Sequence, residues 1–152
     1  MNDSPDMTAT ERIESLKAGT LAALSFTLAY SITVVGNNLV LVEQFDVLAA
    51  LQITSTVDFL VRIAIAWLSG FLFGVTYRYV IRDDENPHLK SGAVLAFGLV
   101  RGLAPAEVEQ NLTAAFWLLC VLGVESVLCF LVARLTLDWA LHRHWVKSFK
   151  SG

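Results

Sequence analysis

The sequence predicts an all-α protein, a four-helix transmembrane bundle with both termini in the cytoplasm. The chain has 152 residues, of which 55% are hydrophobic and only 16% charged, and its mean hydropathy is +0.59. Its apolar residues form long runs, and the charge of the segments between them alternates. With 14 acidic and 11 basic residues and a net charge of −3, the composition excludes a disordered chain and a basic nucleic-acid-binding domain. The length fits a single transmembrane domain.

Three apolar runs are long enough to cross a membrane. A hydrocarbon core of ~30 Å requires about 20 helical residues at ~1.5 Å each. Residues 18–35, 59–81 and 112–137 come close to or exceed this length. Thr8 and Glu11 form a capping-box pair, so the first helix is expected to begin near residue 9. We therefore expect at least three spans.

A fourth span is predicted at residues 87–104. Asn86 followed by Pro87 is typical of an N-cap and first helical residue, and Pro105 cannot continue the helix. Glycines within this segment weaken a helix, so a re-entrant loop is the alternative.

The loop charges favour four complete spans. Residues 36–58 carry three acids and no base, and residues 105–111 carry two acids and no base. Basic residues instead follow the second span and the fourth, and they indicate the cytoplasmic side. A re-entrant third segment would leave the C-terminal tail on the wrong side. Residues 39–53 are semi-polar and are predicted to form an amphipathic surface helix between the first two spans.

Small residues recur at four-residue spacing in the second and third spans. They allow another backbone to approach closely, as in Gly-x-x-x-Gly contacts. We expect the second span to pack on the third through these residues, with a dimer interface as the alternative. The candidate packing residues are Ala66, Gly70, Gly74, Gly98 and Gly102.

Three ionisable residues, Arg62, Arg101 and Glu125, fall within apolar runs. A charge at mid-bilayer costs roughly 3 kcal/mol on insertion scales, so each is expected to face protein or water. The two arginines are expected at one depth in the outer leaflet. There they either hold an anion, such as a lipid phosphate or a partner's acid, or pair with Asp58 and Glu107. Glu125 is either a proton-relay or ligand-anchoring carboxyl, or a structural partner of one of the arginines.

No catalytic, dinucleotide-binding or metal-binding motif is present. Cys120 and Cys129 are nine positions apart and are expected on opposite faces of a helix, so they cannot form a disulfide or share a metal. We therefore predict no catalytic residues, no cofactor, no metal and no nucleic-acid partner.

Residues 70–103 read GFLFGVTYRYVIRDDENPHLKSGAVLAFGLVRGL. The Tyr-Arg-Tyr, Asn-Pro and Ala-Phe-Gly-Leu-Val-Arg-Gly-Leu elements resemble a family of small, functionally uncharacterised integral membrane proteins of cyanobacteria and plastids. The resemblance implies a plasma or thylakoid membrane of a photosynthetic bacterium, and it implies no activity or catalytic residue. The same stretch contains a mixed-charge cytoplasmic turn, which is either a docking surface or a solvated loop. Its candidate residues are Arg78, Arg82, Asp84 and Lys90.

These features favour a non-enzymatic membrane interaction protein, an accessory, assembly or stabilising factor that binds lipids and a larger membrane complex or a second copy of itself. The alternative is an oligomeric channel or small transporter that uses Arg62, Arg101 and Glu125. An enzyme acting on lipid or pigment is a third hypothesis, which would require these three residues to line an open pocket.

Overall fold

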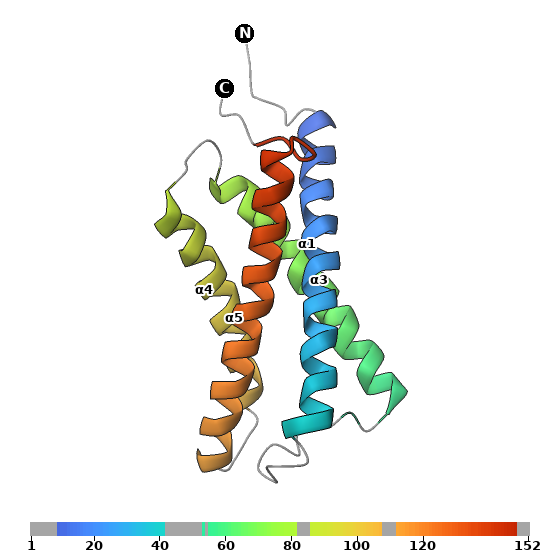
Figure 1. Cartoon of the computed structure of the whole chain (residues 1–152), viewed down its shortest axis with the longest axis vertical. Coiled ribbons are helices and arrows are strands. Elements are labelled where there is room, and N and C mark those ends of the chain that lie inside the picture. Colours follow the sequence, from blue (N-terminus) through green and yellow to red (C-terminus); the bar gives the residue numbers. More distant parts are fainter. Residues whose placement is uncertain (1–8, 42–52, 54, 82–85, 108–111, 149–152) are drawn as a thin grey trace.

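Four long helices make up most of the chain, which confirms the all-α prediction (Figure 1). The computed structural model describes residues 9–41, 53, 55–81, 86–107 and 112–148. The helices are α1 (Ala9–Gly36), α3 (Thr56–Ile81), α4 (Pro87–Leu103) and α5 (Leu112–His142). Successive helices run in opposite directions, so the start of α1 and the end of α5 lie at the same end of the bundle.

Local sequence signals explain where the helices begin and end. The side chain of Asn86 accepts a hydrogen bond from the His88 N–H, and Pro87 occupies the first turn of α4, as predicted. A short 3₁₀ segment, η3 (Ala104–Glu107), follows α4. The last turn of α1 widens into a π-helical segment, η1 (Asn37–Leu41).

Three of the helices are long and apolar enough to cross a membrane: the α1 segment Ala9–Leu39, α3, and the α5 segment Phe116–His142. Large apolar side chains lie exposed along all three, such as Leu28, Leu68 and Leu135. In water this surface would be costly, whereas lipid tails solvate it without penalty. α4 has 17 residues and is the shortest of the four helices.

Small residues join α1 to α3. A Cβ added at Gly70 would lie 2.8 Å from the Ala23 Cα, and one at Gly74 would lie 2.5 Å from the Ala18 carbonyl oxygen. Ala66 is fully buried on the same ridge. These short distances show that the two backbones are in direct contact along the ridge.

A second pair, α4 with α5, is built in the same way. A Cβ at Gly98 would lie 2.9 Å from the Val127 Cα, and one at Gly102 would lie 2.6 Å from the Gly123 Cα. The prediction that the second span packs on the third through these glycines is therefore wrong, because each ridge is already occupied by a different neighbour. The same contacts fill the α3 ridge within one chain, which leaves no room for the alternative dimer interface there.

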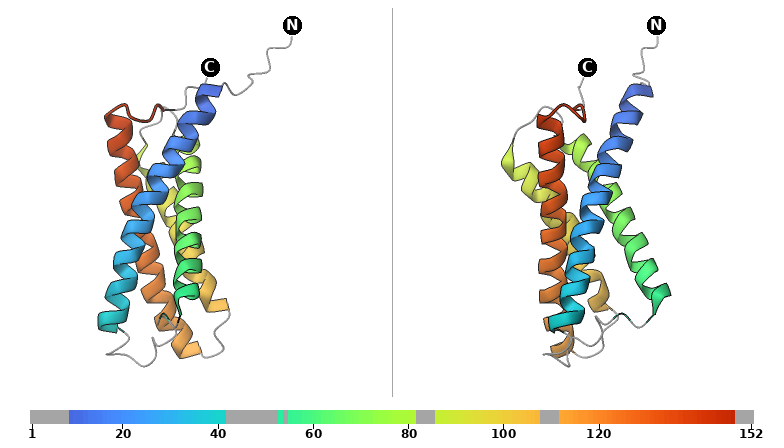
Figure 2. Two further views of the ribbon diagram at one scale, coloured as in Figure 1. Left: turned by 90° about the vertical axis from the view of Figure 1, so that its right-hand side faces the viewer. Right: turned by 45° about the vertical axis from the view of Figure 1, so that its right-hand side comes forward.

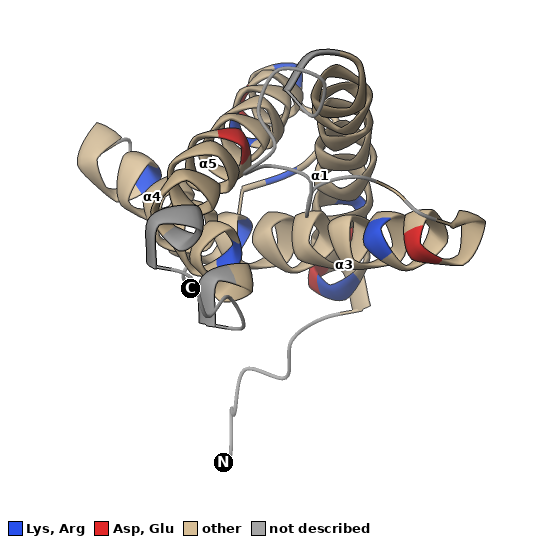
Figure 3. Ribbon diagram, turned by 90° about the horizontal axis from the view of Figure 1, so that it is seen from below, with Lys and Arg blue, Asp and Glu red and all other residues tan. Residues whose placement is uncertain are grey.

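The two pairs meet through α1 and α5, while α3 and α4 separate toward one end (Figures 1 and 2). Seen from that end, α3 extends sideways away from α4 and α5 (Figure 3). We call this the open end, and the end that holds the start of α1 and the end of α5 the closed end. The predicted surface helix at residues 39–53 falls largely outside the described residues.

Candidate functional site

A cavity of about 950 Å³ lies between α3 and α4 in the open half of the bundle. Ile65, Ser69 and Leu72 contribute to its α3 wall, and residues 96, 97 and 100–102 form the α4 wall. Side chains of α1 and α5 form its floor. We call it the lateral cavity. Its size is at the upper end of the range typical of small-molecule sites.

The mouth of the lateral cavity is apolar. Val100 and Ile65, on opposite walls, are 74% and 51% exposed, and Leu72 and Ala96 are also exposed. Apolar side chains at this level of α3 belong to a helix that is suited to lipid contact. The cavity is therefore bordered by exposed apolar side chains of two helices, α3 and α4.

Arg101 brings a guanidinium group into the lateral cavity. One of its Nη atoms donates to the Ser69 hydroxyl at 3.0 Å, which links α4 to α3. The guanidinium carbon also lies 5.3 Å from the centre of the Phe26 ring and 5.0 Å from that of Tyr30. These cation–π contacts offset part of the cost of burying the charge. Within the described residues, no carboxylate forms an ion pair with Arg101.

Arg62 lines the opposite wall. Its Nε donates to both carboxylate oxygens of Asp58, at 3.0 and 3.1 Å. Of the two predicted alternatives for Arg62, the pair with Asp58 is therefore formed. It also lies close to Tyr30. Because Arg101 rests on the ring of the same tyrosine, the structure brings the two arginines together around one side chain. The alternative partner proposed for Arg101, Glu107, has a side chain outside the described set.

Glu125 lies on the α5 wall of the same cavity. The predicted structural pair with Arg62 or Arg101 is not formed, because Arg62 pairs with Asp58 and Arg101 binds Ser69. Glu125 lies instead near the side chain of Asn37, the first residue of η1. Next to it, the hydroxyl of Ser126 is buried and has no hydrogen-bond partner in the described part of the chain. The site thus combines two cations, one carboxyl group and an unused hydroxyl in largely apolar walls.

Aromatic rings close the inner side of the lateral cavity. Phe97 and Phe130 line it, and their ring centres are 5.7 Å apart. Phe73 packs against both, at 5.5 and 5.1 Å, and Tyr77 packs on Phe73 at 5.3 Å. Because these contacts connect α3, α4 and α5, they separate the lateral cavity from the closed end.

A polar network, which we call the clasp, holds the closed end together. Its centre is Arg78 of α3, whose side chain is 1% exposed. Arg78 forms an ion pair with Glu11, donates to the Ser15 hydroxyl at 2.7 Å and donates to the Lys147 carbonyl at 2.9 Å. The Lys147 N–H in turn donates to Glu14 at 2.9 Å. One buried guanidinium group therefore ties α1, α3 and the segment after α5.

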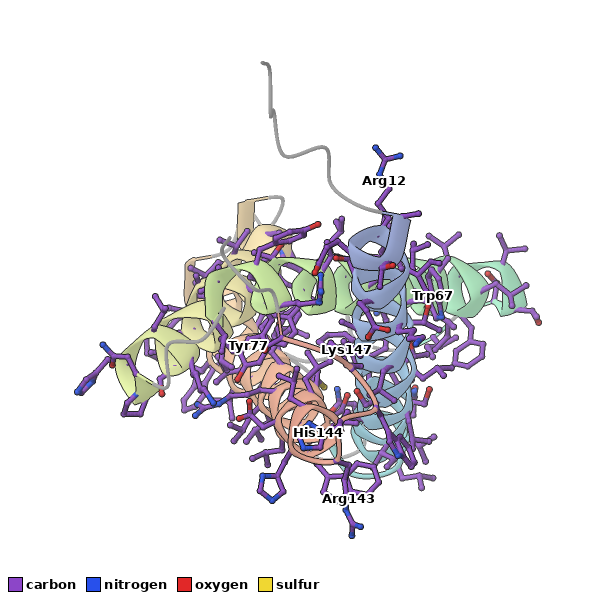
Figure 4. The ribbon with its side chains drawn as sticks, turned by 90° about the horizontal axis from the view of Figure 1, so that it is seen from above. Arg12, Trp67, Tyr77, Arg143, His144 and Lys147 are labelled. Atoms are coloured by element: carbon purple, nitrogen blue, oxygen red, sulfur yellow. The ribbon has the colours of Figure 1, made fainter. Side chains whose placement is uncertain are left out.

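Figure 4 looks down on the closed end. Lys147 lies over the space between α5 and α1, and Tyr77 points toward the interior, whereas Arg12 and Arg143 point outward. The Tyr77 hydroxyl donates to Asp138 at 2.7 Å. Beside this clasp, Asp138 also accepts a hydrogen bond from Lys90 at 3.4 Å. It thereby links α3, α4 and α5.

These positions change the picture of the candidate docking turn at two of its residues. Arg78 is buried in the clasp and cannot present its charge to a partner, and Lys90 is engaged by Asp138. Arg82 and Asp84 lie outside the described residues. The roles of Glu11 and Ser15 in the clasp, and of Asp138 beside it, were not predicted from the sequence. One signal was available, since Arg78 continues the four-residue spacing of Gly70 and Gly74 and therefore faces α1.

The described residues contain no group of three or more His, Cys, Asp or Glu side chains that could hold a metal ion. Cys120 and Cys129 are both free thiols. No protein-family model, no curated protein and no solved structure matches the chain.

Proposed function

We propose that this is a four-span integral membrane protein that binds an amphiphilic molecule from the bilayer in the lateral cavity. It would act without chemistry of its own, as an accessory or stabilising factor. The observation that carries this proposal is the opening between α3 and α4, where a large cavity with polar groups at its wall meets an apolar mouth. An amphiphile has the same division between a polar head and an apolar tail.

The fourth span is part of this proposal. α4 packs its glycines on Gly123 and Val127, which lie inside the membrane-compatible segment of α5. Together with η3, α4 runs alongside α5 toward the open end. A helix at that depth would have to cross the hydrocarbon core.

The basic residues at the closed end favour a cytoplasmic location for that end. Cysteine labelling from each side of sealed vesicles would test the orientation. We expect residues 12 and 143, changed to cysteine one at a time, to be labelled from the same, cytoplasmic side. Labelling from opposite sides would contradict the four-span topology. A photosynthetic membrane as its location rests on the resemblance of residues 70–103 alone.

The binding role is tested by filling the cavity. Ala96 lines the α4 wall, and Leu95 is exposed on the same helix but does not line the cavity. We expect Ala96→Trp to displace the lipids that co-purify with the full-length protein in mild detergent, measured by native mass spectrometry. Leu95→Trp is the matched control and should retain them. Equal retention by both variants would contradict the proposal.

The channel hypothesis is favoured by one observation, the carboxyl group of Glu125 in the cavity wall without an ion-pair partner among the described residues. The packing of Phe73, Phe97 and Phe130 opposes a water path along the axis of one bundle. Ion flux through proteoliposomes, lowered by Glu125→Gln, would support transport and count against a purely binding role.

A further inference from the structure

The lateral cavity also indicates the kind of amphiphile it accepts. We infer that it holds one anionic phospholipid, with the phosphate between Arg62 and Arg101 and an acyl chain along the apolar walls. This inference rests on the proposed binding function and goes further by naming the ligand class.

Charge is the first argument. Asp58 already neutralises Arg62, whereas no carboxylate pairs with Arg101 within the described residues. An arginine has five N–H donors, and the described residues give Arg101 one hydrogen-bond acceptor, the Ser69 hydroxyl. A guanidinium group in an apolar wall is stabilised by an anion that takes its remaining donors. A phospholipid with a net charge of −1 supplies that anion without adding a second cation to the site.

Geometry favours phosphate over a carboxylate. Arg62 and Arg101 come from different walls and converge on Tyr30. A tetrahedral phosphate group presents oxygens in several directions and can accept from two guanidinium groups at once, whereas the two oxygens of a carboxylate lie in one plane. Arginine rather than lysine suits such a site because its planar fork matches the phosphate oxygens.

The remaining polar groups fit a hydroxylated head group. Glu125 and the unpartnered Ser126 hydroxyl lie on the α5 wall of the same cavity. Glu125 and Arg101 line the same cavity, so the carboxyl group and the cationic site face one shared space. The glycerol hydroxyls of phosphatidylglycerol can donate to Glu125 and accept from Ser126. A buried hydroxyl such as that of Ser126 is otherwise costly to leave unpaired.

The apolar surface leads outward from the arginines. Ile65 and Leu72 follow Arg62 along α3, and Val100 precedes Arg101 on α4. These side chains are exposed at the mouth. One acyl chain can therefore lie in the cavity while the second remains in the bilayer, so the lipid need not leave the membrane to bind.

The test uses the full-length protein in mild detergent, with equal amounts of phosphatidylglycerol, phosphatidylcholine and oleate added, and bound lipid is counted by native mass spectrometry. We expect phosphatidylglycerol to be retained about tenfold more than phosphatidylcholine. Both lipids carry the same phosphate, but choline adds a positive charge beside the two arginines and has no hydroxyl group for Glu125 or Ser126. Oleate should compete poorly. Equal retention of the two phospholipids would overturn the inference, and preferential binding of oleate would overturn the assignment to phosphate.

Variants locate the preference in the cavity. Arg101→Gln should abolish the preference for phosphatidylglycerol, and Arg101→Lys should restore only part of it. Arg143→Gln is the matched control, because Arg143 is an exposed arginine on Trp139, away from the cavity. If Arg101→Gln does not fold, Ser69→Ala is the second variant. It should weaken the preference for phosphatidylglycerol, because it removes the hydrogen bond that holds the Arg101 guanidinium group in position. An unchanged preference in the folded Arg101 or Ser69 variant would overturn the inference.

The inference and the proposed function fail in different ways. If Ala96→Trp displaces lipid but the charge of the head group has no effect, the cavity binds amphiphiles without a phosphate site. If Ala96→Trp retains lipid as the wild type does, the binding function itself is wrong.

Discussion

The two ends of this bundle use the same four helices in opposite ways. At the closed end, the polar groups of α1, α3 and the segment after α5 satisfy one another around Arg78, which is almost completely buried. At the open end, α3 separates from α4, and Arg101 lies in a cavity wall with one hydroxyl partner. Both arginines lie within a largely apolar bundle. The ion pair and hydrogen bonds of the fold engage Arg78 from several sides, whereas Arg101 has one hydroxyl partner among the described residues. The difference separates a charge whose partners are supplied by the fold from one that, among the described residues, keeps donors for the proposed ligand.

The closest backbone contacts of the closed half should be the least tolerant of change. Gly74→Leu would place a Cβ 2.5 Å from the Ala18 carbonyl oxygen and a side chain against α1. We expect the free energy of unfolding in detergent to fall by about 3 kcal/mol or more. It can be measured by denaturant titration followed by circular dichroism.

Gly92→Leu is the matched control, because a Cβ at Gly92 would have nothing within 4 Å. It should leave stability unchanged or raise it, since leucine favours a helix over glycine. Equal effects of the two substitutions would contradict the close packing of α1 on α3.

Loss of the clasp should have the next largest effect. Arg78→Leu removes the donors to Ser15 and the Lys147 carbonyl and leaves Glu11 without its ion pair. We expect a loss of about 2 kcal/mol in the free energy of unfolding. Hydrogen exchange at the amide of Lys147 should become faster, because the segment after α5 loses its attachment. Unchanged exchange there would show that the clasp does not hold this segment.

The loss of one tyrosine hydroxyl should lower the free energy of unfolding more in the closed half than in the open half. Tyr77→Phe removes the 2.7 Å bond to Asp138 and should lower the free energy of unfolding by about 1 kcal/mol. Tyr30→Phe makes the same chemical change in the open half and should alter it by less than about 0.5 kcal/mol. Thermal unfolding of both variants measures this difference. A larger loss from Tyr30→Phe would reverse the comparison.

The smallest effect on stability is expected at Arg101. Arg101→Leu removes a charge that the described fold leaves without a carboxylate partner, so the free energy of unfolding in lipid-free detergent should change by less than about 0.5 kcal/mol. The same leucine substitution at Arg78 serves as the comparison. A loss at Arg101 as large as that at Arg78 would show that Arg101 is a structural residue.

Much of the fold follows from local sequence. The start of α4 at Pro87 is fixed by the Asn86 cap and by proline's compatibility with a first turn. The all-α class follows from the length of the apolar runs. The pairing of α3 with α1 and of α4 with α5 was not predicted, because a row of glycines shows that a helix can pack closely but not which helix it packs against. Ala18 and Ala22 of α1 repeat at the same spacing as Gly70 and Gly74, and that match was the available signal.

The three charged residues of the candidate site could be predicted from the sequence, but the cavity that they line could not. Apolar runs interrupted by Arg62, Arg101 and Glu125 identify costly charges. Whether such charges pair with one another depends on how far α3 and α4 diverge, which is a tertiary property that no local pattern encodes. The role of Arg78 was missed for a related reason, because its partners come from two parts of the chain that are distant in sequence, α1 and the segment after α5.

The central claim, that an anionic lipid enters between α3 and α4, is tested most directly by photocrosslinking in bilayers. Phosphatidylglycerol with a photoreactive group near the middle of one acyl chain would be mixed with the full-length protein, and the labelled residues mapped by mass spectrometry. We predict labelling of the cavity residues Leu122 and Phe130, suppressed by excess unlabelled phosphatidylglycerol but not by phosphatidylcholine. Labelling confined to exposed outer residues such as Leu28 and Leu135, with no competition by head group, would contradict the claim.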